Sequence, residues 1–467
     1  MRTIAVAGVM VASCSIAGHA QGFGLNEIGT CAVTRGFAAT SSPCTDGSAV
    51  FWNPAALAQL EGLTLSVGVA RIGLSADFTS DTTGRLFEGA DVAEYPPHAF
   101  VAYRVSPRLA IGAGVYVPYG LTSEWMPDFP GRFISQRASL QTIYVQPALA
   151  LQVAPGWSVG AGPIVGHSTV ELLQAADLSA QTLAPGVSFG ALGVPRGTEF
   201  ARATLEGDAT AFGFNVGVHG RIGDAVQLGV RFLSALDFEY DDADADFRQV
   251  PTGLTVPADL TIPGGPTVPA GTPVDDLLAP QFTEGGPLSA QRVRTAITHP
   301  WQLQGGISVP LADRTMISAE VAVIGWSAFD ELPVDFSNPA TPDLTLIEDY
   351  ETSWTLRLGA EHRLMSGWTG RAGFAYAPTP APDETVTPLL PEQDRLTFAI
   401  GLGVPVGNRW AVDVGYLRVR GEGRRGRIVE RESRAETAEA LNSGFYRLHA
   451  NVISVGVRFG APRENGR

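Results

Sequence analysis

The sequence contains no lysine: all 32 of its basic residues are arginine, and 47 acidic residues outnumber them. With a formal net charge of −15 and no basic run, the chain lacks the clustered positive charge on which binding to nucleic acid depends. Beyond its N-terminus it has no uninterrupted apolar run of about eighteen residues, so we expect no transmembrane helix. Fold and location must therefore be argued from shorter patterns.

The first twenty residues have the features of a signal peptide. Arg2 supplies a positive charge, residues 4–16 form a short apolar core, and residues 18–20 offer small side chains at the cleavage positions. We therefore expect a signal peptide over residues 1–20 and a mature chain that begins at Gln21.

Only three cysteines occur, which limits the possible disulfides to very few. Cleavage after Ala20 would remove Cys14, although residues 11–14 also resemble a lipobox, in which case Cys14 would carry a lipid. Cys31 and Cys44 would remain in an exported chain, where the oxidising compartment favours a disulfide over two free thiols.

Apolar and polar residues alternate along many segments. Between Trp410 and Tyr416, one face holds two aromatic and two valine side chains, and the other holds alanine, aspartate and glycine. A period of two is typical of a strand with one apolar face, and aromatics at both ends of that face favour a membrane barrel over a soluble sandwich. The same alternation occurs in residues 226–232, 354–361, 396–403 and 451–459.

Short turns and long polar connections follow one another in strict alternation, which is typical of outer-membrane barrels. Six short turns and seven long loops imply about fourteen strands. We therefore predict an all-β fold, a transmembrane antiparallel β-barrel over residues 63–459 with a short tail over 460–467. The turns are expected at 105–108, 154–156, 222–224, 311–313, 365–367 and 406–408, and the loops at 74–94, 121–139, 173–204, 241–296, 330–351, 378–393 and 421–447.

The segment that precedes the first strand is compact and stiff. Phe51 and Trp52 form a bulky apolar pair directly before Asn53-Pro54, and proline restricts both its own backbone and that of the residue before it. A stiff apolar segment in front of a large barrel predicts a hatch, or plug, over residues 21–62 that fills the lumen. Charged residues on the polar strand faces are expected to pair with one another and with this plug: Arg231, Arg357, Glu361, Asp413 and Arg458.

Two further segments depart from plain alternation. Strand 109–119 carries Gly112, Gly114 and Pro118 on one face, which predicts either a kink or bulge, or small residues that face a crowded lumen. The loop over 173–204 is rich in apolar residues, which either bind a hydrophobic ligand or pack against another loop. These residues are Leu172, Leu173, Leu178, Leu183, Val187, Phe189 and Leu192.

Several short motifs, in this order along the chain, resemble the FadL/TodX family of outer-membrane channels for hydrophobic compounds. The resemblance covers nearly the whole mature chain, and each motif alone is weak. The motifs are residues 22–27 (GFGLNE), 51–57 (FWNPAAL), 119–125 (YGLTSEW), 212–217 (FGFNVG), 391–395 (PEQDR) and 412–416 (VDVGY).

The resemblance implies a passive path with three stages. A hydrophobic solute would meet an apolar outer groove, enter a lumen site near the mature N-terminus, and leave sideways at a kink in the third strand. Implied for the lumen site are Phe23 and Leu25, for the hatch Asn53, Pro54 and Ala55, and for the lateral gap Gly112, Gly114 and Pro118. The candidate outer groove consists of Leu172, Leu173, Leu183, Phe189 and Leu192.

One departure bears on the solute. Members that carry fatty acids place basic residues near the carboxylate, but the matching stretch 166–173 contains no arginine, and His167 alone could become positive. This leaves room for a neutral or aromatic hydrocarbon as well as a long-chain fatty acid.

The chemistry of the chain favours transport over catalysis. His167 and Ser168 are adjacent, so on a strand they would point to opposite faces, and we expect no enzyme. Asp242, Asp244 and Asp246 resemble the start of a calcium loop but lack its glycine and glutamate, so we expect no metal and no cofactor. Expected partners are the hydrophobic solute and outer-membrane lipid or detergent, and the chain is expected to be a monomer. A general porin for polar solutes and a surface adhesin that uses loop 241–296 remain alternatives.

Overall fold

The computed structural model describes residues 22–184, 187–223, 225–261, 266–365, 367–426 and 442–460. The predicted signal peptide, Cys14, and the tail beyond Gly460 lie outside these residues. Among the residues described, no helix combines the length and apolar character needed to cross a membrane.

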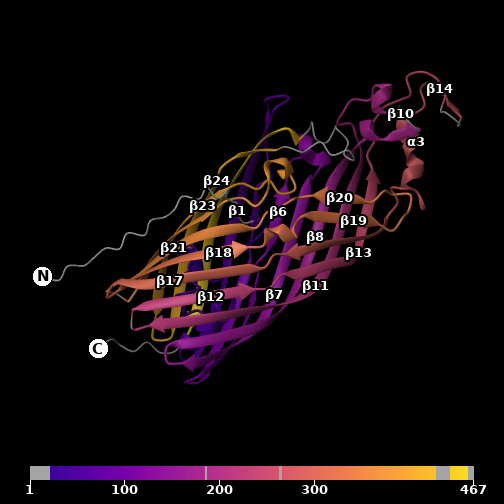
Figure 1. Ribbon diagram of the computed structural model, residues 1–467. Coiled ribbons are helices and arrows are strands. Elements are labelled where there is room, and N and C mark those ends of the chain that lie inside the picture. The colour runs from indigo at the N-terminus through magenta and orange to yellow at the C-terminus, as the bar shows by residue number, and fades with distance from the viewer. Residues whose placement is uncertain are drawn as a thin grey trace.

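Fourteen antiparallel strands close into a barrel, which confirms the predicted fold class (Figure 1). The barrel closes where β26 pairs with β1 over sixteen residue pairs, from Leu65–Phe459 to Ser80–Gly444. The strands are β1 (Leu63–Ser80), β4 (Pro97–Ser106), β5 (Leu109–Tyr116) continued by β6 (Gly120–Glu124), β7 (Arg137–Ala154), β8 (Trp157–Asp177), β11 (Glu199–Ile222), β12 (Val226–Leu233) continued by β13 (Leu236–Gln249), β16 (Gln291–His299) continued by β17 (Gln302–Ala312), β18 (Thr315–Ile324) continued by β19 (Glu331–Phe336), β20 (Leu344–Ile347) continued by β21 (Ser353–Arg363), β22 (Thr369–Ala377), β23 (Arg395–Val406), β24 (Trp410–Gly421) and β26 (Gly444–Phe459).

The two faces of the wall differ as the alternation predicts. On β24, Trp410, Val414 and Tyr416 are exposed on the outer face, whereas Ala411 and Asp413 are buried toward the lumen. Exposed valine, leucine, isoleucine and aromatic side chains recur on the other strands in the same way. A barrel whose outer face is apolar is suited to a membrane rather than to water.

Residues 22–60 fill the lumen. They contain α1 (Thr30–Thr34), α2 (Ala49–Trp52) and the 3₁₀ helix η1 (Pro54–Gln59), and most of their side chains are buried. Pro54 starts η1 at a position where its missing N–H costs nothing, and the Asn53 side chain caps that helix through the N–H of Ala55. A disulfide joins Cys31 to Cys44 within this segment.

The long connections gather at one end of the barrel, where Figure 1 shows α3, β10 and β14 together. Two of the loops share an apolar cluster that contains Leu178, Phe189, Phe200, Val256 and Leu278, all buried. The longest loop is shorter than 241–296, because β13 continues to Gln249 and β16 begins at Gln291. The remaining elements are β2 (Leu86–Glu88), β3 (Val92–Glu94), β9 (Thr182–Ala184), β10 (Val187–Ser188), β14 (Leu260–Thr261), β15 (Thr267–Val268), β25 (Arg424–Gly426), η2 (Pro130–Phe133), η3 (Leu178–Ala180), η4 (Gly190–Leu192), α3 (Val274–Leu278), η5 (Ala279–Phe282), η6 (Trp326–Ala328) and η7 (Asp383–Thr385).

Candidate solute-binding site

A cavity of about 560 Å³ lies between the start of the lumen segment and the barrel wall. Its lining comes from residues 22–27, from β1 and β3, from the junction of β5 and β6, from β7, and from the loop over 390–395. Apolar side chains dominate it and include Phe23, Leu25, Phe37, Ile72, Leu74, Val92, Val117, Leu121, Leu140, Ile143, Leu390, Leu448 and Val452. A mainly apolar cavity with few polar groups is typical of a small-molecule site.

The cavity lies beside the point where the third strand is interrupted. β5 ends with the pair Tyr116–Tyr144, and β6 begins with Gly120–Gln141, so Thr142 and Ile143 of β7 have no partner on that side. Both of these residues line the cavity, although Thr142 is buried toward the lumen and Ile143 is exposed on the outer face. The cavity lining therefore includes residues from both faces of this strand.

The interruption coincides with Pro118, which has no N–H to offer to a neighbouring strand. The wall is joined again at its outer end, where Gly89 bridges Trp125, and at its other end, where β4 pairs with β5 from Ala99–Val115. Next to the bridge the N–H of Ala90 donates to the carbonyl of Glu124 (2.9 Å), and farther along Thr122 Oγ1 donates to Glu94 Oε1 across the gap (2.8 Å).

The start of the lumen segment occupies the interrupted edge. The N–H of Gly120 donates to the carbonyl of Phe23 (2.9 Å), and the N–H of Leu25 donates to the carbonyl of Pro118 (2.8 Å). Arg395 Nη2 also donates to the carbonyl of Gly22 (3.0 Å). Backbone groups that the break would leave unpaired in an apolar surrounding are thus satisfied by the chain's own N-terminal residues.

The charged groups of the cavity lining are mostly acidic. Glu27, Glu94, Glu124 and Glu392 line it, whereas among the described residues Arg395 is its one guanidinium, and that group pairs with Glu392. Burial raises the pKa of Glu392, and Arg395 opposes this shift. Burial likewise raises the pKa of Glu27, against hydrogen bonds from the backbone and the attraction of Arg395.

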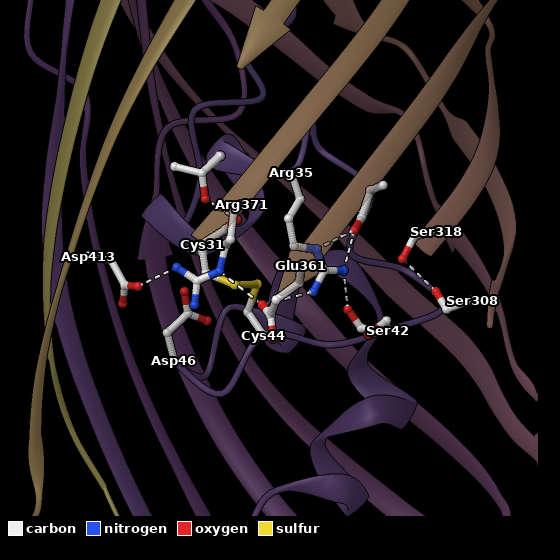
Figure 2. Close-up of polar contacts among 12 residues, drawn as sticks. Cys31, Arg35, Ser42, Cys44, Asp46, Ser308, Ser318, Glu361, Arg371 and Asp413 are labelled. Atoms are coloured by element: carbon white, nitrogen blue, oxygen red, sulfur yellow. Dashed lines mark hydrogen bonds and ion pairs between the residues drawn. A yellow bond between two sulfur atoms is a disulfide. The ribbon is translucent and has the colours of Figure 1, made fainter. Parts of the chain in front are cut away.

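The lumen segment is fixed to the barrel by an ion-pair chain (Figure 2). Arg35 of the segment lies 4.0 Å from Glu361 on β21, and Arg371 on β22 contacts Glu361 at 2.9 Å and Asp413 on β24 at 2.5 Å. Arg35 Nη2 also donates to the carbonyl of Ser42 (2.6 Å). Three strands are therefore tied to one another and to the segment by groups that are shielded from water.

A second anchor lies on β18. The buried carboxylate of Glu320 accepts from the backbone N–H groups of Thr40 and Ser41, both at 2.9 Å, from Ser41 Oγ at 2.8 Å, and from Gln304 Nε2 at 2.9 Å. Such full satisfaction offsets the cost of burying a carboxylate.

Arginine side chains also face the apolar corner of the segment. Arg231 lies 4.3 Å above the ring of Phe51, and Arg357 lies 5.4 Å from Trp52. Arg231 donates to Gln302 (2.7 Å), and Arg357 donates to Gln304 (3.0 Å). Contacts of this kind attract a desolvated cation to an aromatic face.

The corner at Asn53 is matched by two wall glycines. A side chain at Gly217 would lie 2.1 Å from Asn53 Oδ1, and one at Gly160 would lie 2.3 Å from the nitrogen of Ala55. Asn53 Nδ2 donates to the carbonyls of Thr40 and Val218, each at 3.0 Å. Only glycine permits this close approach between lumen segment and wall.

The structure brings some of the predicted site residues together and separates others. Phe23, Leu25 and His167 all line the cavity, but His167 is on the exposed outer face and contacts Thr210 (3.3 Å). The candidate outer-groove residues do not line this cavity. Leu172 and Leu173 are half-buried on β8, Phe189 is buried in the loop cluster with Leu183 at its edge, and Leu192 is exposed.

The predicted lateral-gap residues have two different surroundings. A side chain at Gly112 would lie 2.9 Å from Val50, and one at Gly114 would lie 2.7 Å from the ring of Phe100, so both glycines face a crowded lumen. Pro118 lies at the break itself. Asn53, Pro54 and Ala55 lie at the start of η1 against β8 and β11.

Sequence reasoning missed Glu320, Arg371 and Arg395. The alternation places Glu320 and Arg371 on lumen faces, so their burial could be predicted. Their partners could not be predicted, because these lie far away in the sequence. Asp242, Asp244 and Asp246, expected in a loop, lie on β13, and no metal-holding group of three or more ligands is found among the described residues.

Fold and site together define an outer-membrane β-barrel with a buried N-terminal segment and an apolar cavity beside an interrupted strand. Residues 10–460 match the family described as outer membrane protein transport protein (OMPP1/FadL/TodX), and the chain belongs to this family. It is accordingly a protein of the outer membrane.

The relatives are distant but match over nearly their full lengths. A long-chain fatty acid transport protein of Escherichia coli O6:H1 is 25% identical over 89% of this chain and 90% of its own length. The solved structure of a Pseudomonas aeruginosa FadL homologue has a TM-score of 0.77 at 20% identity and covers 94% of this chain and 100% of its own. The Pseudomonas putida toluene transporter TodX has a TM-score of 0.65 at 15% identity, with 94% and 99% covered.

Proposed function

We propose that the chain is a passive channel for neutral hydrophobic small molecules, which pass through the 560 Å³ cavity and leave through the gap in the barrel wall. The observation that carries this proposal is the lining of the cavity by both faces of β7 at Thr142 and Ile143. A path of that shape delivers an apolar solute to the membrane interior without returning it to water.

Partitioning alone can drive this movement. Transfer of apolar surface out of water is favourable by roughly 25 cal/mol per Å², so each apolar stage is downhill from solution. The path lies within one barrel, which is consistent with a monomer. We also propose that a solute arriving from outside first meets an apolar groove at the outer end of the barrel. The residues of this groove are Leu172, Leu173, Leu183, Phe189 and Leu192.

The charges favour a neutral solute over a carboxylate. Four glutamates line the cavity, and its guanidinium, Arg395, is already engaged by Glu392 and the carbonyl of Gly22. A fatty-acid anion would lose hydration without gaining an uncompensated cation. Neutral hydrocarbons and other uncharged apolar molecules carry no such cost.

The alternatives receive less support from the geometry. A porin for ions needs an open lumen, but residues 22–60 are bound to β11, β18 and β21 by hydrogen bonds and an ion pair. Catalysis by His167 with Ser168 is disfavoured, because His167 is exposed on the outer face while Ser168 is buried. If residues 250–290 act as an adhesin, their deletion should abolish adhesion and leave solute uptake unchanged.

Uptake by cells that express the chain tests the proposal. We expect radiolabelled toluene to enter at least several-fold faster than in cells without the chain, and oleate to show a smaller gain at neutral pH. Planar-bilayer recordings of the purified protein should show no large steady ion current. Equal toluene uptake with and without the chain, or a porin-like current, would contradict the proposal.

A further inference from the structure

The side chain of Phe23 is enclosed by aromatic rings from three distant parts of the chain. Its ring centroid lies 4.8 Å from Trp326, 5.2 Å from Phe329, 5.6 Å from His299 and 5.9 Å from Tyr119. Three of the four contacts are edge-to-face, an arrangement that a benzene ring prefers. We call these four residues the aromatic cage. Its occupant is a single phenyl group.

Phe23 separates the aromatic cage from the cavity. Phe23 itself lines the cavity, whereas none of the four cage residues belongs to the cavity lining. The ring is only 3% exposed, so it fills the cage and closes it at the same time. If the ring moved aside, the cage would become a continuation of the solute path.

The cage and its rim also hold polar atoms without a partner. His299 Nε2, Trp326 Nε1 and the hydroxyl of Tyr350 are buried, and none has a hydrogen-bond partner among the described residues. Tyr350 stands next to the cage, 5.1 Å from the ring of Phe329 and 6.3 Å from that of Trp326. A phenyl side chain cannot satisfy such atoms, although buried polar groups are normally paired.

We propose that the aromatic cage is a binding station for a single aromatic ring that carries one neutral hydrogen-bonding group, such as a phenol. In the absence of a solute, the side chain of Phe23 occupies this station. An incoming ring replaces the edge-to-face contacts of Phe23, and its hydroxyl pairs with a polar atom that Phe23 leaves unpaired. The inference rests on the proposed transport function and narrows its solute class.

The backbone around Phe23 suits such an exchange. Gly22 and Gly24 flank it, and Gly22 has φ +50°, where other residues are strained. A side chain at Gly22 would lie 2.6 Å from the Trp326 ring, so the chain passes directly over the cage. The segment is held on either side of the ring by Arg395 and by Gly120.

Fluorine NMR of the full-length protein in detergent tests the exchange, with 4-fluorophenylalanine at position 23. We expect phenol to convert the resonance of the caged ring into that of a displaced ring, saturably, with toluene needing at least several-fold higher concentrations. Cyclohexanol, which has the hydroxyl but no aromatic ring, should have little effect. The same label at Phe212, which is 74% exposed on the outer face, reports effects of phenol on the detergent and should show no saturable change.

The variant Trp326→Phe tests the polar part, because it keeps an aromatic wall and removes the N–H. We expect the preference for phenol over toluene to fall several-fold. No displacement of Phe23 by phenol at its solubility limit, or equal displacement by cyclohexanol, overturns the station. An unchanged preference in Trp326→Phe overturns the role of its N–H.

These outcomes are separable from failure of transport. If cells take up toluene but phenol never displaces Phe23, the station is wrong and the channel stands. If phenol displaces Phe23 but no uptake occurs, the cage binds aromatic rings and the transport proposal is wrong.

Discussion

At the scale of residues, the buried carboxylate that holds the plug and those that line the cavity differ in how completely they are hydrogen-bonded. Glu320 is fully supplied with donors from Thr40, Ser41 and Gln304, so it serves as an anchor. Glu392 is equally buried, but its Oε2 has no hydrogen-bond partner in the described structure. Glu27 contacts the backbone N–H of Asn26 (3.0 Å). Burial without full compensation favours the neutral acid.

This difference predicts a pH dependence of stability. A raised pKa means that the folded protein binds the proton more tightly than the unfolded chain, so stability falls as the pH rises from about 4.5 through the raised pKa. Glu27→Gln should therefore raise the unfolding temperature at pH 7 by a few degrees and flatten its decline above pH 4.5.

Thermal unfolding in detergent between pH 4.5 and 7.5 measures this effect. Glu61→Gln, at an exposed carboxylate, is the matched control and should follow the wild type. A wild-type protein that becomes more stable over this whole range, with Glu27→Gln parallel to it, would contradict the assignment.

At the scale of elements, the interrupted third strand is the main irregularity of the described barrel wall. The break between β5 and β6 lies at Pro118, and the lumen segment pairs with the free edge at Gly120. Gly112 and Gly114 have a different role, since they admit Val50 and Phe100. Pro118 thus accompanies the break in the strand, whereas Gly112 and Gly114 leave space for neighbouring apolar side chains inside the barrel.

Closing the opening should stop transport without harming the barrel. Thr122 lines the cavity at the gap, so a tryptophan there fills space that a solute needs. Thr122→Trp should lower toluene uptake by about tenfold while the amount of folded protein in the outer membrane stays unchanged.

Val321→Trp, on the exposed outer face of β18, is the control and should leave uptake intact. Unaltered uptake in a correctly assembled Thr122→Trp protein would show that solutes use another exit.

The sequence supported the elements much better than the site. Strands such as 410–416 can be recognised from a local alternation of apolar and polar residues, and short turns mark where they end. The fourteen-strand barrel could therefore be predicted. The cavity could not, because it joins residues 22–27 to Val117, to residues 120–124 and to residues 390–393, whose contact depends on register around the barrel. The alternation predicted that His167 lies on a strand. It did not predict whether the His167 side chain points to the lumen or to the outer face.

At the scale of the whole molecule, the lumen segment is a cross-linked unit that braces the wall from within. The Cys31–Cys44 disulfide closes a loop between α1 and α2, and the ion pairs of Arg35, Arg371 and Asp413 connect this unit to three strands. The plug is therefore fixed near its middle, while its first residues, 22–25, are held by a few backbone hydrogen bonds.

Loss of the disulfide should loosen the plug more than the barrel. For a loop of 13 residues, removal of the cross-link typically costs about 3 kcal/mol. Cys31→Ala with Cys44→Ala should keep a heat-modifiable folded barrel but admit small hydrophilic antibiotics and show intermittent ion currents.

Planar-bilayer conductance and antibiotic sensitivity measure this leak. Cys31→Ser with Cys44→Ser is a second version that retains polar side chains of similar size. Wild-type conductance in both double variants would show that the ion pairs suffice to hold the plug.

The seam between β1 and β26 is also contacted from inside by the plug. The plug contacts β1, β24 and β26 from inside, and Thr30 Oγ1 lies 2.8 Å from Ser454 Oγ on the last strand. The strands β1 and β26 are therefore held together both by their own backbone pairing and through the plug. The plug thus reinforces, from within, the line along which the cylinder closes.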